Sequence, residues 1–110
     1  MTEGKLWTER DRFGNDIYLT QERWEHIIDP DNHPEVKPFF DHLAKTVRLG
    51  RRKQDPYDQN SYKYYHAFPD APDDNTHLVV CVHFRWSTDA DGNVREEKFV
   101  TTTYFQAFEE

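Results

Sequence analysis

The chain of 110 residues has the size of one small domain, and its mean hydropathy of −1.05 marks it as strongly polar. Aromatic residues still make up 15% of it, which excludes a disordered protein, because disordered chains are poor in aromatic side chains. The net charge of −7 argues against unspecific nucleic-acid binding, which needs Lys and Arg to displace counterions. We therefore expect residues 1–110 to form one folded domain with a thin, aromatic-rich core.

The cysteine content and the hydrophobic pattern bear on where the protein works. Cys81 is the only cysteine, so no disulfide can form within the chain, and a reducing compartment is the simpler expectation. No apolar run approaches the length of a membrane span, and the N-terminus lacks the hydrophobic region of a signal peptide. The sequence predicts a soluble, cytoplasmic protein that does not engage a membrane.

The first predicted element is a β-hairpin. Residues 5–9 and 16–19 can form two short strands, and Gly14-Asn15 between them is a turn signal. Because its strands are so short, we expect this hairpin at an edge.

A helix is expected to follow, from about Gln21 to Ile28. Trp24, Ile27 and Ile28 are spaced so that they lie together on one face of a helix. The Thr20 hydroxyl can cap the start by accepting from a free backbone N–H. This pattern predicts a helix that packs on the core through its tryptophan.

His26 is the first candidate for chemistry. It lies two residues past Trp24, about 200° around a 3.6-residue helix, so it does not share the apolar stripe. One interpretation is a solvated histidine paired with Glu22, one turn earlier. The other is an imidazole held away from the core and free to exchange protons.

A second helix is expected after a polar connector. Pro38 suits its first turn, where the missing N–H is no loss, and Gly50 ends it. Its apolar stripe is formed by Phe39, Phe40, Leu43, Ala44 and Val47.

A basic band begins in this helix and continues beyond it. Residues 45–63 contain six basic and two acidic side chains, a net charge of +4, so the rest of the chain carries −11. We expect residues 51–60 to form a loop that is basic at first and then rich in turn-forming residues. Arg48, Arg51 and Lys63 in this band are candidate phosphate ligands. The alternative is a band of solvated charges.

The C-terminal half predicts antiparallel strands. Residues 61–68 favour a strand, and residues 76–86 and 94–106 form a hairpin around the turn signal Asp91-Gly92. We expect this hairpin to be the clearest element of the chain, because residues 76–86 alternate well.

The register of this hairpin decides which side chains share a face. With a two-residue turn, Phe84 lies opposite Phe99 and Leu78 lies opposite Phe105 on the core side. The predicted pairs on the other face are His83 with Val100, Cys81 with Thr102, and Val79 with Tyr104. We therefore expect one face, not covered by helices, to carry His83, Arg85, Thr102 and Tyr104.

Several short motifs resemble one protein family. They are Asp11-Arg12-Phe13-Gly14-Asn15, Ile17-Tyr18-Leu19-Thr20, Arg23-Trp24-Glu25-His26-Ile27, His33-Pro34-Glu35, Tyr64-Tyr65, Leu78-Val79-Val80 and Phe99-Val100-Thr101-Thr102-Thr103-Tyr104. The pattern looks like the phage and prokaryotic domains grouped with barnase, EndoU, colicin-type tRNases and RelE, the BECR superfamily. The resemblance spans nearly the whole chain, roughly residues 11–104.

The resemblance implies an α+β fold, with an N-terminal hairpin and two helices packed on a roughly four-stranded antiparallel sheet. It also implies metal-independent cleavage of RNA by transesterification, without a cofactor, often in toxin or conflict systems. RNA is then the expected substrate, and a cognate inhibitor or antitoxin protein is an expected partner.

Such cleavage needs a base for the ribose 2′-OH, an acid for the leaving 5′-oxygen, and donors on the phosphate. The residues that match the family's recurring positions are His26, Thr102 and Tyr104. The sequence itself adds His83 with Arg85, as a proton carrier and a clamp on one sheet face. The further candidate phosphate ligands are Arg48, Arg51 and Lys63. Each residue has a plainer alternative, as a solvated charge or an ordinary strand residue.

Three other interpretations bear on function. A metal site is poorly supported, because the chain has no His-Glu-x-x-His motif and no cysteine pair. An inactive binding module of the same fold, whose acidic surface engages a basic protein, is the main alternative. A self-associating scaffold, in which exposed strand edges pair between copies, is the third, so a monomer or a small homo-oligomer is expected.

Overall fold

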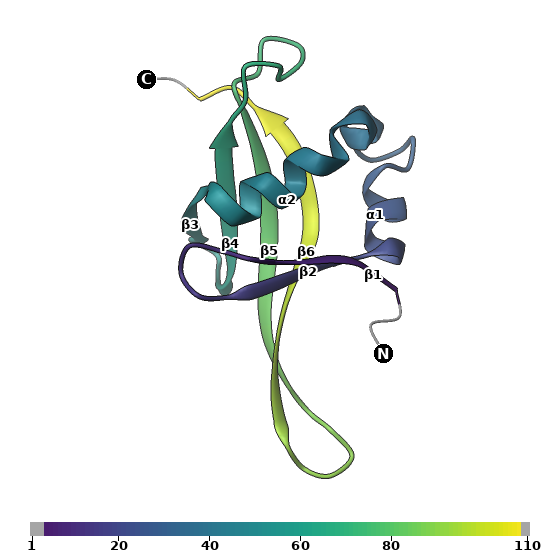
Figure 1. Cartoon of the computed structure of the whole chain (residues 1–110), viewed down its shortest axis with the longest axis vertical. Coiled ribbons are helices and arrows are strands. Elements are labelled where there is room, and N and C mark those ends of the chain that lie inside the picture. The colour runs from purple at the N-terminus through teal and green to yellow at the C-terminus, as the bar shows by residue number, and fades with distance from the viewer. Residues whose placement is uncertain (1–3, 109–110) are drawn as a thin grey trace.

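The computed structural model describes residues 4–108 as an α+β fold built on a single sheet (Figure 1). The elements are β1 (Lys5–Arg10), β2 (Asp16–Thr20), α1 (Gln21–Ile27), η1 (Pro34–Phe39), α2 (Phe40–Leu49), β3 (Arg51–Asp55), β4 (Asp58–Ala67), β5 (His77–Thr88) and β6 (Val94–Gln106). The predicted N-terminal hairpin, both α-helices and the C-terminal hairpin are all present. The Thr20 hydroxyl caps α1, as expected, by accepting from the backbone N–H of Arg23 at 3.1 Å.

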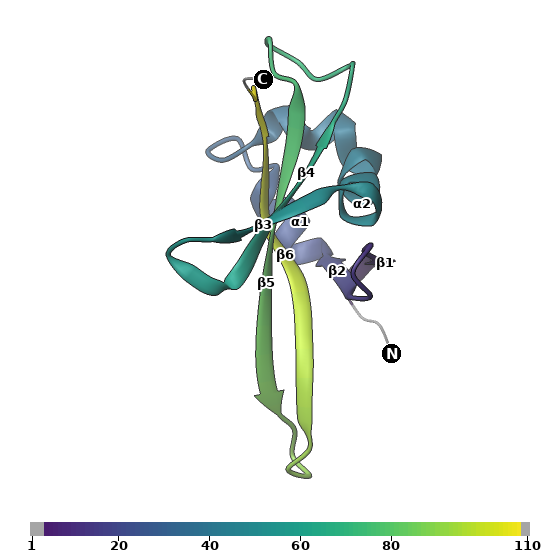
Figure 2. The ribbon, with the colours of Figure 1, turned by 90° about the vertical axis from the view of Figure 1, so that its left-hand side faces the viewer.

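The sheet corrects the expected four antiparallel strands. It has six strands in the order β1-β2-β6-β5-β4-β3, and it is mixed because β2 runs parallel to β6. The N-terminal hairpin joins the sheet through the single pair Tyr18 and Phe99, and it also packs across the helix-covered face, as expected, with Ile17 and Leu19 in the core (Figure 2). Residues 51–55, expected as loop, form the edge strand β3. Their charged side chains show no apolar alternation, because an edge strand is largely exposed on both faces.

The two helices pack against one face of this sheet, and α2 crosses β4 and β5 (Figures 1 and 2). The buried core between them contains Ile17, Leu19, Ile27, Leu43, Val47, Tyr64, Leu78, Val80, Val82 and Val100. On β5 the core residues alternate with Cys81 and His83, which therefore point to the opposite face. We call that opposite side, which faces away from α2, the open face.

Gly50 lets α2 lie close to the sheet. A Cβ atom at this position would lie 2.4 Å from the carbonyl oxygen of Thr46 and 2.7 Å from that of Tyr65. Its φ of −72° is ordinary, so glycine is required here by this close approach and not by backbone conformation. The expected end of the helix at Gly50 is confirmed, with a steric cause.

The β5–β6 hairpin contains a β-bulge between the Cys81 and Val82 pairs. The register matches the prediction from His77 to Cys81 but not from Val82 onward. Cys81 lies opposite Thr102, as expected, but the register shifts at the next pair, so that His83 faces Phe99 and not Val100. The loop between the strands spans residues 89–93, whereas a two-residue turn was expected. It is stabilised by the Asp89 carboxylate, which accepts hydrogen bonds from the backbone N–H groups of Asp91 and Asn93. The bulge absorbs the resulting one-residue difference. The expected pair of Phe84 with Phe99 is therefore wrong.

The same hairpin projects beyond the sheet as a two-stranded arm (Figures 1 and 2). The arm makes the molecule elongated, with extents of 50 × 28 × 23 Å. Trp86 on this arm is 69% exposed. Within residues 4–108, no helix has the length and apolar character needed to cross a membrane.

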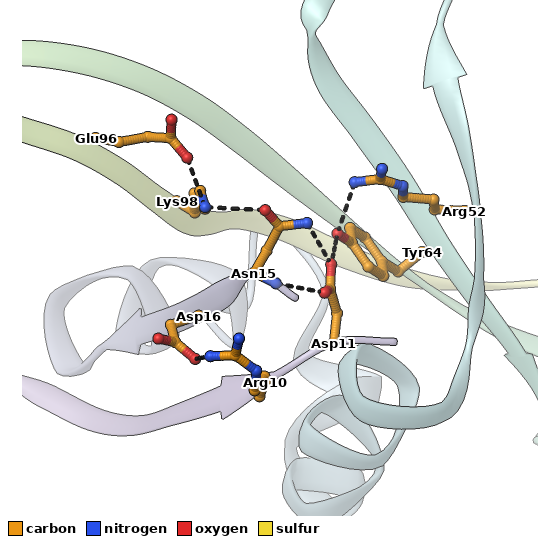
Figure 3. Close-up of polar contacts among 8 residues, drawn as sticks. All are labelled: Arg10, Asp11, Asn15, Asp16, Arg52, Tyr64, Glu96 and Lys98. Atoms are coloured by element: carbon orange, nitrogen blue, oxygen red, sulfur yellow. Dashed lines mark hydrogen bonds and ion pairs between the residues drawn. The ribbon is translucent and has the colours of Figure 1, made fainter. Parts of the chain in front are cut away.

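A buried polar cluster joins the β1–β2 turn to the sheet on the helix-covered side (Figure 3). The Asp11 carboxylate accepts the backbone N–H groups of Phe13 and Asn15 at 2.9 and 2.8 Å, and also the Tyr64 hydroxyl. The Arg52 guanidinium donates to the same hydroxyl at 3.4 Å and lies 4.2 Å from the centre of the Phe13 ring. Burial opposes ionisation of Asp11, but these hydrogen bonds outweigh it and lower the pKa of the carboxyl group below its usual value.

Candidate functional site

The open face carries most of the predicted functional side chains on three adjacent strands. Strand pairing places Lys63 opposite Cys81 and Cys81 opposite Thr102. The next pairs on this face are Ser61 with His83 and Val79 with Tyr104. His83, Thr102 and Tyr104 are therefore brought onto one surface, as the alternation of β5 and β6 predicted, and Lys63, whose face the sequence left open, joins them from β4.

His83 is oriented by two polar neighbours that the sequence did not reveal. The Ser61 hydroxyl donates to Asp58 Oδ2 at 2.8 Å and lies 2.9 Å from His83 Nδ1. Because the serine proton is directed at the carboxylate, its oxygen is left to accept a proton held on Nδ1. Asp58 Oδ2 itself lies 3.6 Å from the same nitrogen. This series of hydrogen bonds from His83 through Ser61 to Asp58 favours the Nδ1–H tautomer of His83. The Nε2 lone pair is then left to act as a base.

Lys63 and Tyr104 form the second part of the candidate site. Hydrogen bonding to the Tyr104 hydroxyl is the main cause that raises the pKa of the Lys63 ammonium group. Lys63 therefore stays protonated at neutral pH and can carry a fixed positive charge. Cys81 lies between these residues and His83, and burial raises the pKa of its thiol, which disfavours the reactive thiolate.

His33 joins this surface from outside the sheet. Its ring centre lies 6.1 Å from that of Tyr104, and its Nδ1 lies 3.3 Å from Glu35 Oε2. The loop before η1 is held by the His33 backbone N–H, which donates to the carbonyl of Ile27 at 2.8 Å. The sequence offered His33 only as part of a family motif, because the path of this loop is not visible in any periodicity.

Arg85 also lies on the open face, but its charge is already paired. Its guanidinium contacts Glu97 Oε2 at 2.6 and 2.9 Å and lies 5.0 Å from the centre of the Phe99 ring. An arginine held in this way is less available to bind a phosphate than Lys63.

Three predicted residues do not share the centre of this surface. Arg48 lies on α2, on the helix-covered side, where its guanidinium is 3.6 Å from Glu9. Arg51 begins β3, opposite Tyr65, and is exposed at the far edge of the sheet. His26 is exposed on α1, and its backbone carbonyl accepts the Asn32 side-chain amide at 2.8 Å.

Metal ligands are not grouped in the structure. Across residues 4–108, no group of three or more His, Cys, Asp or Glu side chains is arranged to hold an ion.

We compared the chain with protein families, curated proteins and solved structures. No protein-family model, no curated protein and no solved structure matches the chain.

Proposed function

We propose that the protein is a metal-independent endoribonuclease of the BECR type, acting as a toxin or phage-derived effector, with its active site on the open face. The observation that carries the proposal is the arrangement of His83, with a free Nε2, beside the Lys63–Tyr104 pair. A base, a fixed cation and a hydroxyl donor are the groups that RNA transesterification needs.

His83 acts as the base in this proposal. Its Nε2 removes the proton of the ribose 2′-OH, and the 2′-oxygen forms a bond to the adjacent phosphorus. The phosphorus–O5′ bond breaks, which leaves a 2′,3′-cyclic phosphate on one product. The leaving 5′-oxygen takes a proton from solvent water, and His83 later releases its own proton to solvent.

Lys63 and Thr102 hold the phosphate as its negative charge shifts during the reaction. Lys63 is opposite Cys81, and Cys81 is two residues from His83, so base and cation are separated by about 7 Å along the strands. We assign no role in this step to His26 and Arg48, because the helices α1 and α2 that carry them pack on the opposite face of the sheet (Figure 2).

The proposal is tested with a labelled single-stranded RNA in the presence of EDTA. The wild-type chain should cut it and leave a cyclic phosphate, whereas a fully 2′-O-methylated copy should stay intact because it has no 2′-OH. His83→Ala should abolish most of the cleavage, and His26→Ala is the matched control that should retain it. Absence of cleavage by the wild-type chain, or equal cleavage by His83→Ala, would refute the proposal.

The acidic charge favours a second candidate, an inactive binding module that engages a basic protein. Outside residues 45–63 the chain carries a net charge of −11, which would attract such a partner and would repel RNA. Expression in a bacterial host separates the two functions. A ribonuclease should slow growth through His83, whereas a binding module should leave growth unchanged or slow it equally with His83→Ala.

A further inference from the structure

A groove on the open face continues from the candidate cleavage site toward the C-terminus. It has a volume of about 450 Å³. Its lining residues are Lys53, Gln54, Pro56, Lys63, Tyr65, Val79, Gln106 and Phe108. Lys63 belongs both to this groove and to the candidate cleavage site, so a ligand can reach from one to the other.

The charge of this groove is opposite to that of the molecule. The chain carries −7 overall, yet among residues 4–108 two lysines and no carboxylate line the groove, with Asp55 of β3 close enough to act on Lys63. Lys53 and Lys63 lie directly opposite each other on β3 and β4. This pairing places two positively charged side chains on the same face of neighbouring strands, where both can contact one bound anion.

The walls of the groove are aromatic and held in place. The ring centres of Tyr65 and Phe108 are 5.2 Å apart, and Phe108 stacks on His77 at 4.2 Å with an interplanar angle of 16°. The Phe108 backbone N–H donates to the Thr76 hydroxyl at 2.9 Å, which fixes this part of the chain against the sheet. Rigid aromatic walls beside paired cations are typical of single-stranded nucleic-acid binding.

We propose that this groove binds one unpaired nucleobase next to the scissile phosphate, with the base against Tyr65 and Phe108 and its flanking phosphate on Lys53. The assignment of RNA as the ligand rests on the proposed function. A duplex is excluded as a ligand, because its bases are stacked on one another and cannot offer a free face to the protein. The groove therefore makes the enzyme specific for single-stranded RNA.

Binding is measured separately from cleavage, by fluorescence anisotropy of a labelled, fully 2′-O-methylated single strand that cannot be cut. Phe108→Ala should weaken binding about ten-fold, the loss typical of one base–aromatic contact. Trp86→Ala is the matched control, because it removes an exposed aromatic side chain on the arm. Lys53→Gln should lower the salt dependence of binding, whereas Lys37→Gln, on η1, should not.

The outcomes distinguish the groove from the cleavage site. Binding of the uncut strand that depends on Phe108 and Lys53 supports the groove, even if RNA is never cleaved. Cleavage of RNA with unchanged binding by Phe108→Ala and Lys53→Gln would overturn the groove and leave the proposed function standing. Equal competition by a duplex or by inorganic polyphosphate would also overturn it, because charge alone would then explain the binding.

Discussion

The two faces of the sheet use the same strands for different purposes. On the helix-covered face, Val80 and Val82 of β5 are fully buried against the core. On the open face, Cys81 and His83 of the same strand are only half-buried, and His83 is held by polar neighbours. Core packing and candidate chemistry therefore alternate between successive residues of β5, so substitutions at neighbouring positions should separate stability from activity.

The sharpest test compares His83 with the preceding residue. His83→Ala should lower the cleavage rate about 10²- to 10⁴-fold, the usual contribution of a general base, and should change stability little. Val82→Ala should instead lower the free energy of unfolding by about 1–3 kcal/mol, because it leaves a cavity, with cleavage per folded molecule unchanged. Cleavage kinetics and urea denaturation measure the two effects, and a large rate loss in Val82→Ala would break the comparison.

The next largest loss of stability is expected from a substitution in the buried polar cluster. Tyr64→Phe removes the hydroxyl that donates to Asp11 and should destabilise the fold by about 1–3 kcal/mol. Tyr62→Phe, on the same face of β4, is the matched variant and should have a smaller effect. Equal denaturation midpoints for the two variants would mean that the cluster adds no stability.

Protonation of Asp11 at low pH should lower the free energy of unfolding. Because the pKa of Asp11 in the folded chain is below its usual value of 3.8, its contribution is fully present above that pH and is lost as pH falls through the lower folded value. Asp11→Asn should therefore flatten the acid side of a plot of unfolding free energy against pH. An unchanged slope in this variant would assign the acid sensitivity to other carboxylates.

The smallest effect is expected at Arg85. Its contact with Glu97 is largely exposed, so Arg85→Gln should cost at most about 1 kcal/mol of stability. Its effect on cleavage should be small beside that of Lys63→Gln, because only Lys63 is placed with Tyr104 at the proposed phosphate site. A rate loss in Arg85→Gln that matches Lys63→Gln would place a second phosphate ligand at Arg85.

The local elements of this protein can be predicted from its amino-acid sequence. The apolar spacing at Trp24 and Ile27, the cap at Thr20 and the alternation of residues 78–86 each depend on neighbours along the chain, so they can be read from it. The shared face of His83, Thr102 and Tyr104 followed from the same alternation, since a strand has a strict period of two.

The contacts between distant segments become visible only in the folded chain. The parallel pair of Tyr18 with Phe99, the Asp58–Ser61–His83 chain and the approach of His33 to Tyr104 join residues from separate elements or loops. No periodicity encodes such contacts, because they depend on loop paths and on one bulge in β6. That bulge moved the partner of His83 by one residue, which shows how a single local irregularity redefines a site built from several strands.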